Sequence, residues 1–395
     1  MRSTLALAVL CLCAASPLLA ENFLILPFFN LSGDSNLQWI GESLSENVRE
    51  TLAAEGVLAL DRDDRQEAYR RLSIRPDTQL TRATVMRVGE FVDADQIIFG
   101  TFQYTPPGNG LPRTRGTLKI VAQIINLKKA SRGPEYTEIG SLEDLARLQT
   151  HLAWQTLQFV TPATAPSEQE FRSRRPVIRV EAIENYIRGL LTSASEPRLH
   201  LLQQAVRLDP KFSQANFQLG KVYWGRKAWK SAADQFVRVA PWDVRYREAN
   251  FFLGLCHYKL GDFQEAQTAF GVVAQSVPLN EVWNNFGAAQ SRLNSPDALA
   301  SFQKALEGDP ADPDYQFNVG YALFKQGNVE KAAERFRAVL DRDPNDAEAT
   351  VLLGRCLKQA GKDPGVTNSQ GLERLKETYE ESAWLQLKAV LERKR

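Results

Sequence analysis

The chain has 395 residues, a nearly balanced formal charge of +1 and 44% hydrophobic residues. A chain of this length normally holds two or more domains, and its balanced charge provides no general attraction to nucleic acid or to anionic membranes. The three histidines, His151, His200 and His257, are scattered along the sequence, which argues against a histidine-based metal site.

Residues 1–20 have the pattern of a secretory signal peptide. Arg2 supplies a short basic start, an apolar run extends from Leu5 to Ala15, and small residues precede a cleavage site after Ala20. The apolar run is too short for a comfortable membrane span. We therefore expect a periplasmic or secreted protein, with an uncleaved anchor in the inner membrane as the alternative.

Residues 21–160 alternate between strand and helix patterns. Short apolar runs bounded by turn residues predict strands, and apolar residues at helical spacing predict helices. The predicted strands cover residues 23–29, 57–60, 95–104, 117–128 and 135–139, and the predicted helices cover 37–52, 65–72, 82–92 and 141–160. This mixture indicates a compact α/β layer domain.

Two stretches of this region carry a family resemblance. They read LPFFNLSGDSNLQWIGESLSENVRETLAAEGV at residues 26–57 and ADQIIFGTF at residues 94–102. Both resemble the amino-terminal domain of TolB-type and CsgG/FlgO-type envelope proteins. The resemblance implies an envelope protein and brings no catalytic residues with it.

A polar loop lies between the first predicted strand and helix, and it contains Asn30, Ser32, Gly33 and Asp34. A helix N-terminus can bind an anion or a small ligand. The same residue types are what a tight turn and a helix N-cap require. We interpret the loop chiefly as a turn and cap, with a ligand site as the alternative.

Residues 161–179 begin with a run of proline, alanine and small hydroxyl residues and continue with a polar stretch. This composition is typical of a linker between domains. We expect the linker to make few contacts, so that the parts on either side fold independently.

Residues 180–361 contain an internal repeat. Alanine and phenylalanine four residues apart recur every 32 to 34 residues, as Ala232/Phe236, Ala266/Phe270, Ala298/Phe302 and Ala332/Phe336. A glycine precedes each pair in phase, at Gly220, Gly254, Gly287 and Gly320. Small residues allow two helices to approach closely, and phenylalanine fills the space beside them. The pattern resembles the tetratricopeptide repeat, a two-helix hairpin that stacks into a solenoid.

The overall prediction is an α/β N-terminal domain followed by an all-α tetratricopeptide-like solenoid. Residues 362–395 should form a loop and one or two charged capping helices, from Gly371 to Arg395, because a solenoid needs a polar end cap.

The resemblance to this repeat family assigns the groove residues by their offset from each repeat glycine. They are Phe217, Lys221, Trp224, Phe251, Tyr258, Asn284, Asn285, Arg292, Phe317, Asn318, Tyr321, Phe324 and Arg355. Asn285 and Asn318 are placed to reach the backbone of a bound peptide. Aromatic residues ringed by basic ones suit an apolar segment carrying acidic groups. The alternative is that individual aromatics only pack between hairpins or under the N-terminal domain.

The sequence contains no nucleophile elbow, phosphate-binding loop, dinucleotide-binding turn or zincin motif. We therefore expect a non-enzymatic protein without cofactor or metal. The predicted function is a protein–protein interaction scaffold that holds an envelope partner's peptide in the groove. The alternative is an envelope sensor whose N-terminal domain binds a small ligand and signals through the repeats.

Overall fold

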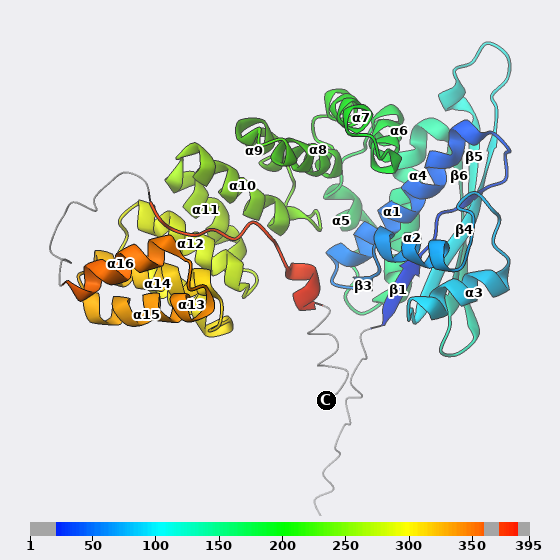
Figure 1. The fold of residues 1–395 in the computed structure, drawn as a ribbon. Helices are drawn as coiled ribbons and strands as arrows, with labels where there is room; N and C mark the ends of the chain where they lie inside the picture. Colours follow the sequence, from blue (N-terminus) through cyan, green and yellow to red (C-terminus); the bar gives the residue numbers. More distant parts are fainter. Residues whose placement is uncertain (1–20, 359–370, 386–395) are drawn as a thin grey trace, which may run out of the picture.

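The computed structural model describes residues 21–358 and 371–385. It shows an α/β region followed by an array of helices, which confirms the predicted fold class (Figure 1). The predicted signal peptide, the predicted loop at residues 362–370 and residues 386–395 of the predicted C-terminal cap lie outside the described residues. Within the described ranges, no helix is long and apolar enough to cross a membrane.

The N-terminal region is built around one mixed sheet. Its strand order is β3-β1-β4-β5-β6, with the short strand β2 also pairing with β4. Strand β1 runs parallel to β3 and β4, and β5 pairs antiparallel with both β4 and β6. The strands are β1 (Asn22–Ile25), β2 (Phe29–Asn30), β3 (Leu58–Ala59), β4 (Gln96–Thr105), β5 (Thr117–Asn126) and β6 (Ser131–Ser141). The single strand expected over residues 23–29 is two strands, because the chain leaves the ladder around Pro27.

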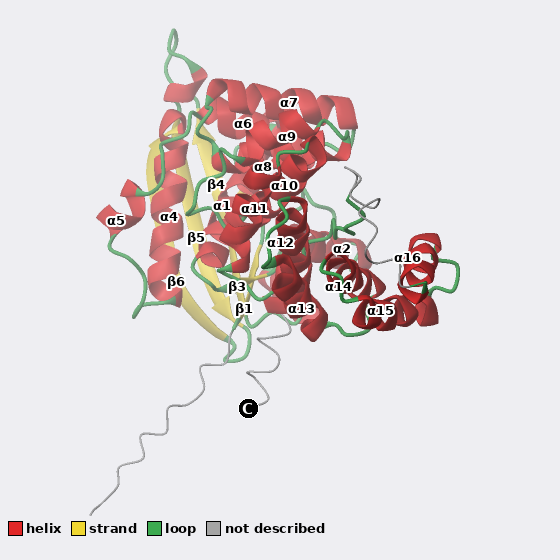
Figure 2. Cartoon of the chain, turned by 90° about the vertical axis from the view of Figure 1, so that its left-hand side faces the viewer, coloured by secondary structure: helices red, strands yellow, loops and turns green. Residues whose placement is uncertain are grey.

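Helices cover both faces of this sheet. Alternation along β1 sends Phe23 and Ile25 into the core shared with α1 (Gln38–Ala54) and α4 (Leu145–Val160). It sends Leu24 and Leu26 into the opposite core with α2 (Arg62–Arg71) and α3 (Arg82–Phe91). Figure 2 shows α4 lying along β5 and β6. Three short 3-10 turns complete the region: η1 (Ser35–Leu37), η2 (Arg113–Arg115) and η3 (Leu142–Asp144).

The helical array consists of stacked hairpins. Its helices are α6 (Val180–Leu191), α7 (Ser195–Leu208), α8 (Ser213–Gly225), α9 (Trp229–Phe236), α10 (Tyr246–Leu260), α11 (Phe263–Ala274), α12 (Asn280–Arg292), α13 (Ala298–Gly308), α14 (Pro313–Lys325), α15 (Val329–Arg342) and α16 (Ala347–Leu357). The repeat residues meet as their types require: a Cβ atom added at Gly254 would lie 2.7 Å from the ring of Phe270, and one at Gly220 would lie 2.7 Å from that of Phe236. Each glycine therefore admits the phenylalanine of its own hairpin.

The segment between the two regions is packed, so the expectation of a linker with few contacts is wrong. It contains a short helix, α5 (Glu168–Ser173), whose Phe171 is fully buried. One continuous hydrophobic cluster runs from the sheet through α1 and α4 to Ile183 and Tyr186 of α6. A single aromatic residue in a polar stretch is enough to anchor this segment.

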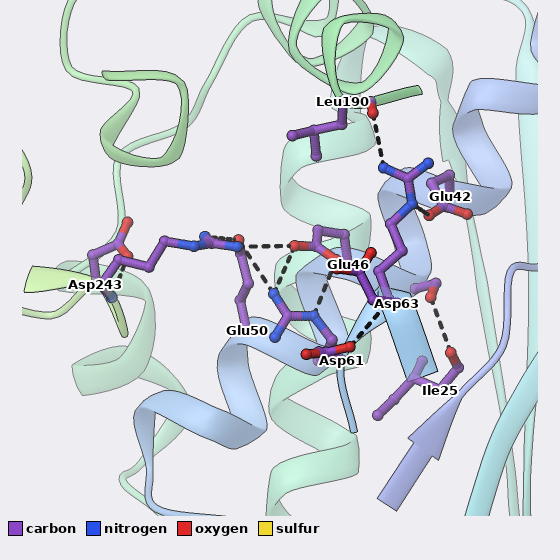
Figure 3. Close-up of polar contacts among 12 residues, drawn as sticks. Ile25, Glu42, Glu46, Glu50, Asp61, Asp63, Leu190 and Asp243 are labelled. Carbon is purple, nitrogen blue, oxygen red and sulfur yellow. Dashed lines mark hydrogen bonds and ion pairs between the residues drawn. The ribbon is translucent and has the colours of Figure 1, made fainter. Parts of the chain in front are cut away.

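Buried charges also join the two regions (Figure 3). Arg245, which directly precedes α10, contacts the carboxylates of Glu46 and Glu50 on α1. Arg49 pairs with Glu46 at 2.7 Å in the same cluster. Nearer the start of α1, Arg62 pairs with Glu42 and donates to the carbonyl of Leu190 at the end of α6 at 2.9 Å. The array is thus held to the N-terminal region through side chains as well as through the chain itself.

Residues 371–380 are extended and not helical, so the predicted capping helix is wrong there. Only residues 381–385 of the described C-terminal part form a helix. Figure 1 shows this segment running back along the array beside α12 and α10. The hydrogen bonds that hold it in this conformation come from side chains of the array, as described next.

Candidate functional site

The first helices of three successive hairpins, α10, α12 and α14, form a surface that contacts residues 371–385. This surface is called the groove below, and residues 371–385 are called the tail. The tail crosses the groove in an extended conformation and ends in a short helix against α10. The groove predicted from the repeats therefore holds a segment of the chain itself.

Two asparagines bind the tail through its backbone. Asn318 accepts from the N–H of Arg374 at 2.8 Å and donates to its carbonyl at 2.7 Å. Asn285 makes the same pair of bonds to Lys376, at 2.9 and 2.7 Å. Asn284 adds a second donor to the carbonyl of Arg374 at 2.7 Å. All three asparagines are fully buried, and these bonds satisfy their amide groups.

The spacing of these bonds requires an extended ligand. Asn285 and Asn318 lie two residues before Gly287 and Gly320, so each comes from the same position of neighbouring repeats. They contact tail residues two apart. In an extended chain such residues are about 6.6–6.8 Å apart and face the same side, whereas in a helix they are only about 3 Å apart along the axis. One repeat of the groove thus corresponds to one two-residue step of the bound chain.

An acidic side of the groove binds the two basic side chains of the tail. Arg374 contacts Asp346 at 2.7 Å and also reaches Asp314 and Glu348, while its guanidinium lies 3.7 Å from the ring centroid of Phe317. Lys376 contacts Asp312 and Asp314, each at 2.7 Å. The hydrogen bond from Arg374 to Asp346 is the main cause that lowers the pKa of the Asp346 carboxyl group.

The opposite side binds acidic side chains of the tail. The Glu373 carboxylate accepts from Ser291 at 2.5 Å and lies 3.9 Å from Lys325. Glu377 pairs with Lys259 at 2.8 Å, and Glu381 pairs with Arg247 at 2.5 Å. Burial lowers the pKa of Lys325 while nearby Glu373 opposes that shift.

Apolar contacts lie between the charged sides. Tyr379 packs its ring 5.1 Å from that of Phe251, which is fully buried. Leu375 and Trp384 are partly buried against the clusters of the array. The arrangement therefore combines sequence-independent backbone bonds with side-chain contacts that depend on charge and shape.

Comparisons with known proteins identify the repeats. Residues 248–280, 288–334 and 320–365 match family models described as tetratricopeptide repeat. The part of the helical array from α10 onward is therefore made of tetratricopeptide repeats. Such repeats bind protein or peptide partners and typically form non-catalytic scaffolds.

Among curated proteins, the chain is 30% identical over 124 residues to the CTR9 homolog of Arabidopsis thaliana, covering 30% of this chain and 11% of that protein. It is 25% identical over 150 residues to the protein O-mannosyl-transferase TMTC1 of Homo sapiens, covering 36% of this chain and 17% of that protein. The chain thus spans only a small part of the curated relatives it matches.

Among solved structures, it is similar to YrrB, described as a TPR protein with an unusual peptide-binding site, at 23% identity and a TM-score of 0.40 over 45% of this chain and 92% of that one. It is also similar to MamA, at 17% identity and a TM-score of 0.37 over 41% and 96% of the two chains.

The predicted groove residues fall into two sets. The set next to the tail comprises Phe251, Tyr258, Asn284, Asn285, Phe317, Asn318, Tyr321 and Arg292. The remaining residues form no hydrogen bond, ion pair or ring contact with the described tail. Phe217 lies under Arg245, Lys221 pairs with Glu248, and Trp224 packs between Trp229 and Phe252. Phe324 is buried, and Arg355 is exposed. Binding of a separate partner by these residues stays a prediction.

Sequence reasoning missed the acidic side of the groove. Asp312 and Asp346 are N-caps of α14 and α16, and each accepts from backbone N–H groups of its own helix. A cap of this kind is explained locally, so it gave no reason to expect a second contact. The expected ligand, apolar with acidic groups, is therefore incomplete, because the groove also takes basic side chains.

The polar groups of the Asn30–Asp34 loop are used within the loop and its neighbours. Asn30 accepts from Ser32 N–H at 2.8 Å and donates to the carbonyl of Asp34 at 2.8 Å. Ser32 accepts from Tyr104 N–H at 2.6 Å, and Gly33 has a positive φ of 72°. Asp34 caps η1 through Asn36 N–H. The turn and cap interpretation accounts for all four residues.

A cavity of about 340 Å³ lies elsewhere in the N-terminal region. Its lining includes Phe29, Tyr69 and Phe99 as aromatic surface, Glu42 and Gln123 as polar groups, and Leu191 from the end of α6. Burial raises the pKa of Tyr69 to about 12, so its hydroxyl stays protonated. The volume lies in the range of small-molecule sites.

Proposed function

We propose that this protein is a secreted or periplasmic interaction scaffold that binds an extended segment of a protein partner in the groove. The observation that carries the proposal is the paired hydrogen bonding of Asn285 and Asn318 to the backbone of the tail. Side chains placed to replace the partners of an extended backbone bind chains of many sequences. The location rests on residues 1–20, which have the signal-peptide pattern.

The N-terminal domain would dock elsewhere in the envelope, as its resemblance to TolB-type and CsgG/FlgO-type domains implies. The packed joint between the regions supports this division of roles, because a fixed joint holds the groove in a set orientation to the docking domain. The partner would then be an envelope protein.

The test is photo-crosslinking in intact cells. A photoreactive amino acid replaces Lys259, which borders the groove, and a control protein carries it at Arg337, exposed on α15. We expect a partner adduct from the first position that is lost when Asn285 and Asn318 are both changed to alanine. The proposal would be contradicted by equal adduct yields from both positions, or by an adduct whose yield is unchanged when Asn285 and Asn318 are replaced.

A second candidate function, the small-ligand sensor, is favoured by the 340 Å³ cavity. Its lining joins the sheet to Leu191 of the first repeat helix, so a ligand there would contact both regions. The named polar groups are an amide, a phenol and the Glu42 carboxylate, which already pairs with Arg62 and Arg65, so they suit a neutral ligand with an apolar body. A thermal-shift screen of such compounds tests it, with Tyr69→Ala as the variant expected to lose any stabilisation.

A further inference from the structure

The tail is bound as a ligand would be, with few of the features of a structural element. Over residues 371–380 it is neither helix nor strand. Its backbone bonds from Arg374, Lys376 and Glu380 go to side chains of the array. Its side chains form ion pairs that range from exposed, as between Lys259 and Glu377, to largely buried, as between Arg374 and Asp346; the exposed ones individually contribute little to stability.

The groove beneath the tail is not suited to standing empty. Removing the tail would leave the amides of Asn284, Asn285 and Asn318 without the backbone groups that they bind. It would also uncover the ring of Phe317, on which Arg374 lies. Unpaired polar groups beside apolar surface favour a new occupant of the same shape.

The contacts also specify the order of charges along that occupant. Counting along the tail, Glu373 meets Ser291 and Lys325, Arg374 and Lys376 meet the acidic side, and Glu377 meets Lys259. Leu375 and Tyr379 supply the apolar contacts. The order is acid, base, leucine, base, acid, then an aromatic residue two positions later.

We propose that the tail is a latch that closes the groove within the same chain, and that the segment which displaces it is an extended peptide with this charge order. The inference rests on the proposed function, since it assumes that the groove accepts a separate chain. Residues 359–370 separate the tail from the array in the sequence. A short tether gives an effective concentration on the order of millimolar.

The latch raises the affinity that a competitor needs. If the free tail sequence binds with a Kd of about 10 μM, a tether at about 1 mM weakens the apparent affinity of any competitor about 100-fold. A partner with the same contacts would therefore bind poorly until the tail is released. Raising the salt concentration should weaken the binding of both the tail and a competing peptide, because salt screens the partly exposed ion pairs that recognise their charges.

The experiment uses a fluorescein-labelled peptide with the sequence of residues 371–385, titrated into full-length protein and followed by anisotropy. The R374E/K376E protein has a weakened tail and an unchanged groove, so we expect it to bind the peptide about 100-fold more tightly than wild type. R337E/R342E makes the same charge change on exposed positions of α15 and should match wild type. Adding N285A/N318A to R374E/K376E should abolish binding, and a peptide with both basic residues changed to glutamate should bind at least tenfold more weakly.

Folding of each variant is checked by its melting curve, and neither Arg374 nor Lys376 belongs to the hydrophobic clusters of the array. Equal peptide affinity for wild type and R374E/K376E, or no binding to either, would overturn the latch. So would a wild-type protein that associates through exchanged tails, seen as dimers lost in R374E/K376E. If the Lys259 crosslink to a partner persists and depends on the asparagines while the peptide fails to bind, the proposed function stands and only the latch fails.

Discussion

Replacing Arg245 with alanine should strongly destabilise the joint between the N-terminal region and the array. The side chains of Arg245, Glu46 and Glu50 are only 16%, 9% and 8% exposed, so the cluster lies in the regime of buried ion pairs. Removing one partner there leaves a buried charge without compensation and costs about 3–5 kcal/mol. We therefore expect R245A to lower the free energy of unfolding by about that amount at pH 8.

The assay is urea unfolding followed by circular dichroism, with hydrogen exchange read separately for peptides of α1 and α10. R226A is the matched control, since Arg226 pairs with the exposed Glu196 at 2.8 Å and should contribute no more than about 1 kcal/mol. We expect R245A to raise exchange in both α1 and α10, because the two helices share the cluster.

The double variant E50Q/R245M tests whether charge is the cause. Replacing a buried pair by uncharged groups of similar size is often nearly neutral. It should therefore recover much of the stability that R245A loses. The reasoning is refuted if R245A costs no more than R226A, or if the double variant is as unstable as R245A.

Three further predictions concern a repeat glycine, a buried carboxyl group and the N-terminus of the mature chain. G254A should destabilise by about 1–3 kcal/mol because its Cβ would meet the Phe270 ring. G354A should be neutral or stabilising in the same thermal unfolding assay, because among the described residues nothing beyond its own helix lies within 4 Å of the added Cβ. Burial is the main cause that raises the pKa of Glu50 to about 7; the carboxylates of Glu46 and Asp243 add to the shift and Arg245 opposes it. Between the unfolded and folded pKa values the folded protein holds a proton that the unfolded chain has lost. The melting temperature of wild type should therefore fall from pH 5 to pH 7.5, and that of E50Q should fall less. The mass of protein recovered from the envelope should show a mature chain beginning at Glu21, and a retained Met1 would contradict the signal peptide.

Periodicity was sufficient to predict the repeats, because their positions are set by local contacts within a hairpin. Gly254 leaves room for the Phe270 ring within its own hairpin, so the spacing of such a pair in the sequence predicts the hairpin directly. The same holds for Asn285 and Asn318, whose offset from the repeat glycine predicted a reach to peptide backbone. The sheet was predictable for a similar reason, since β4 and β5 are long, apolar and separated by a turn.

The tail could not be predicted in this way, because its local pattern and its tertiary contacts disagree. The sequence predicts a capping helix here because a solenoid needs a polar end cap, and Leu372, Leu375 and Tyr379 also follow helical spacing. Helix propensity is a weak preference that tertiary contacts override, and here backbone bonds from two asparagines hold the chain extended. The packed linker escaped prediction likewise, since Phe171 stands alone in a polar stretch.

The groove binds the tail through two kinds of contact: hydrogen bonds to its backbone and contacts with its side chains. The asparagine pairs occupy only two repeats; at the corresponding position before Gly254 the residue is Phe252, which packs against Phe236 and cannot bind backbone. At this hairpin the tail stops being extended, and Tyr379 and Glu381 bind through their side chains to Phe251 and Arg247. Backbone bonds are the same for every sequence, so choice among partners must come from the charged sides and from this aromatic contact. A ligand that makes only the backbone bonds should bind with little discrimination, whereas one that also matches the charged sides and places an aromatic residue on Phe251 should be selected.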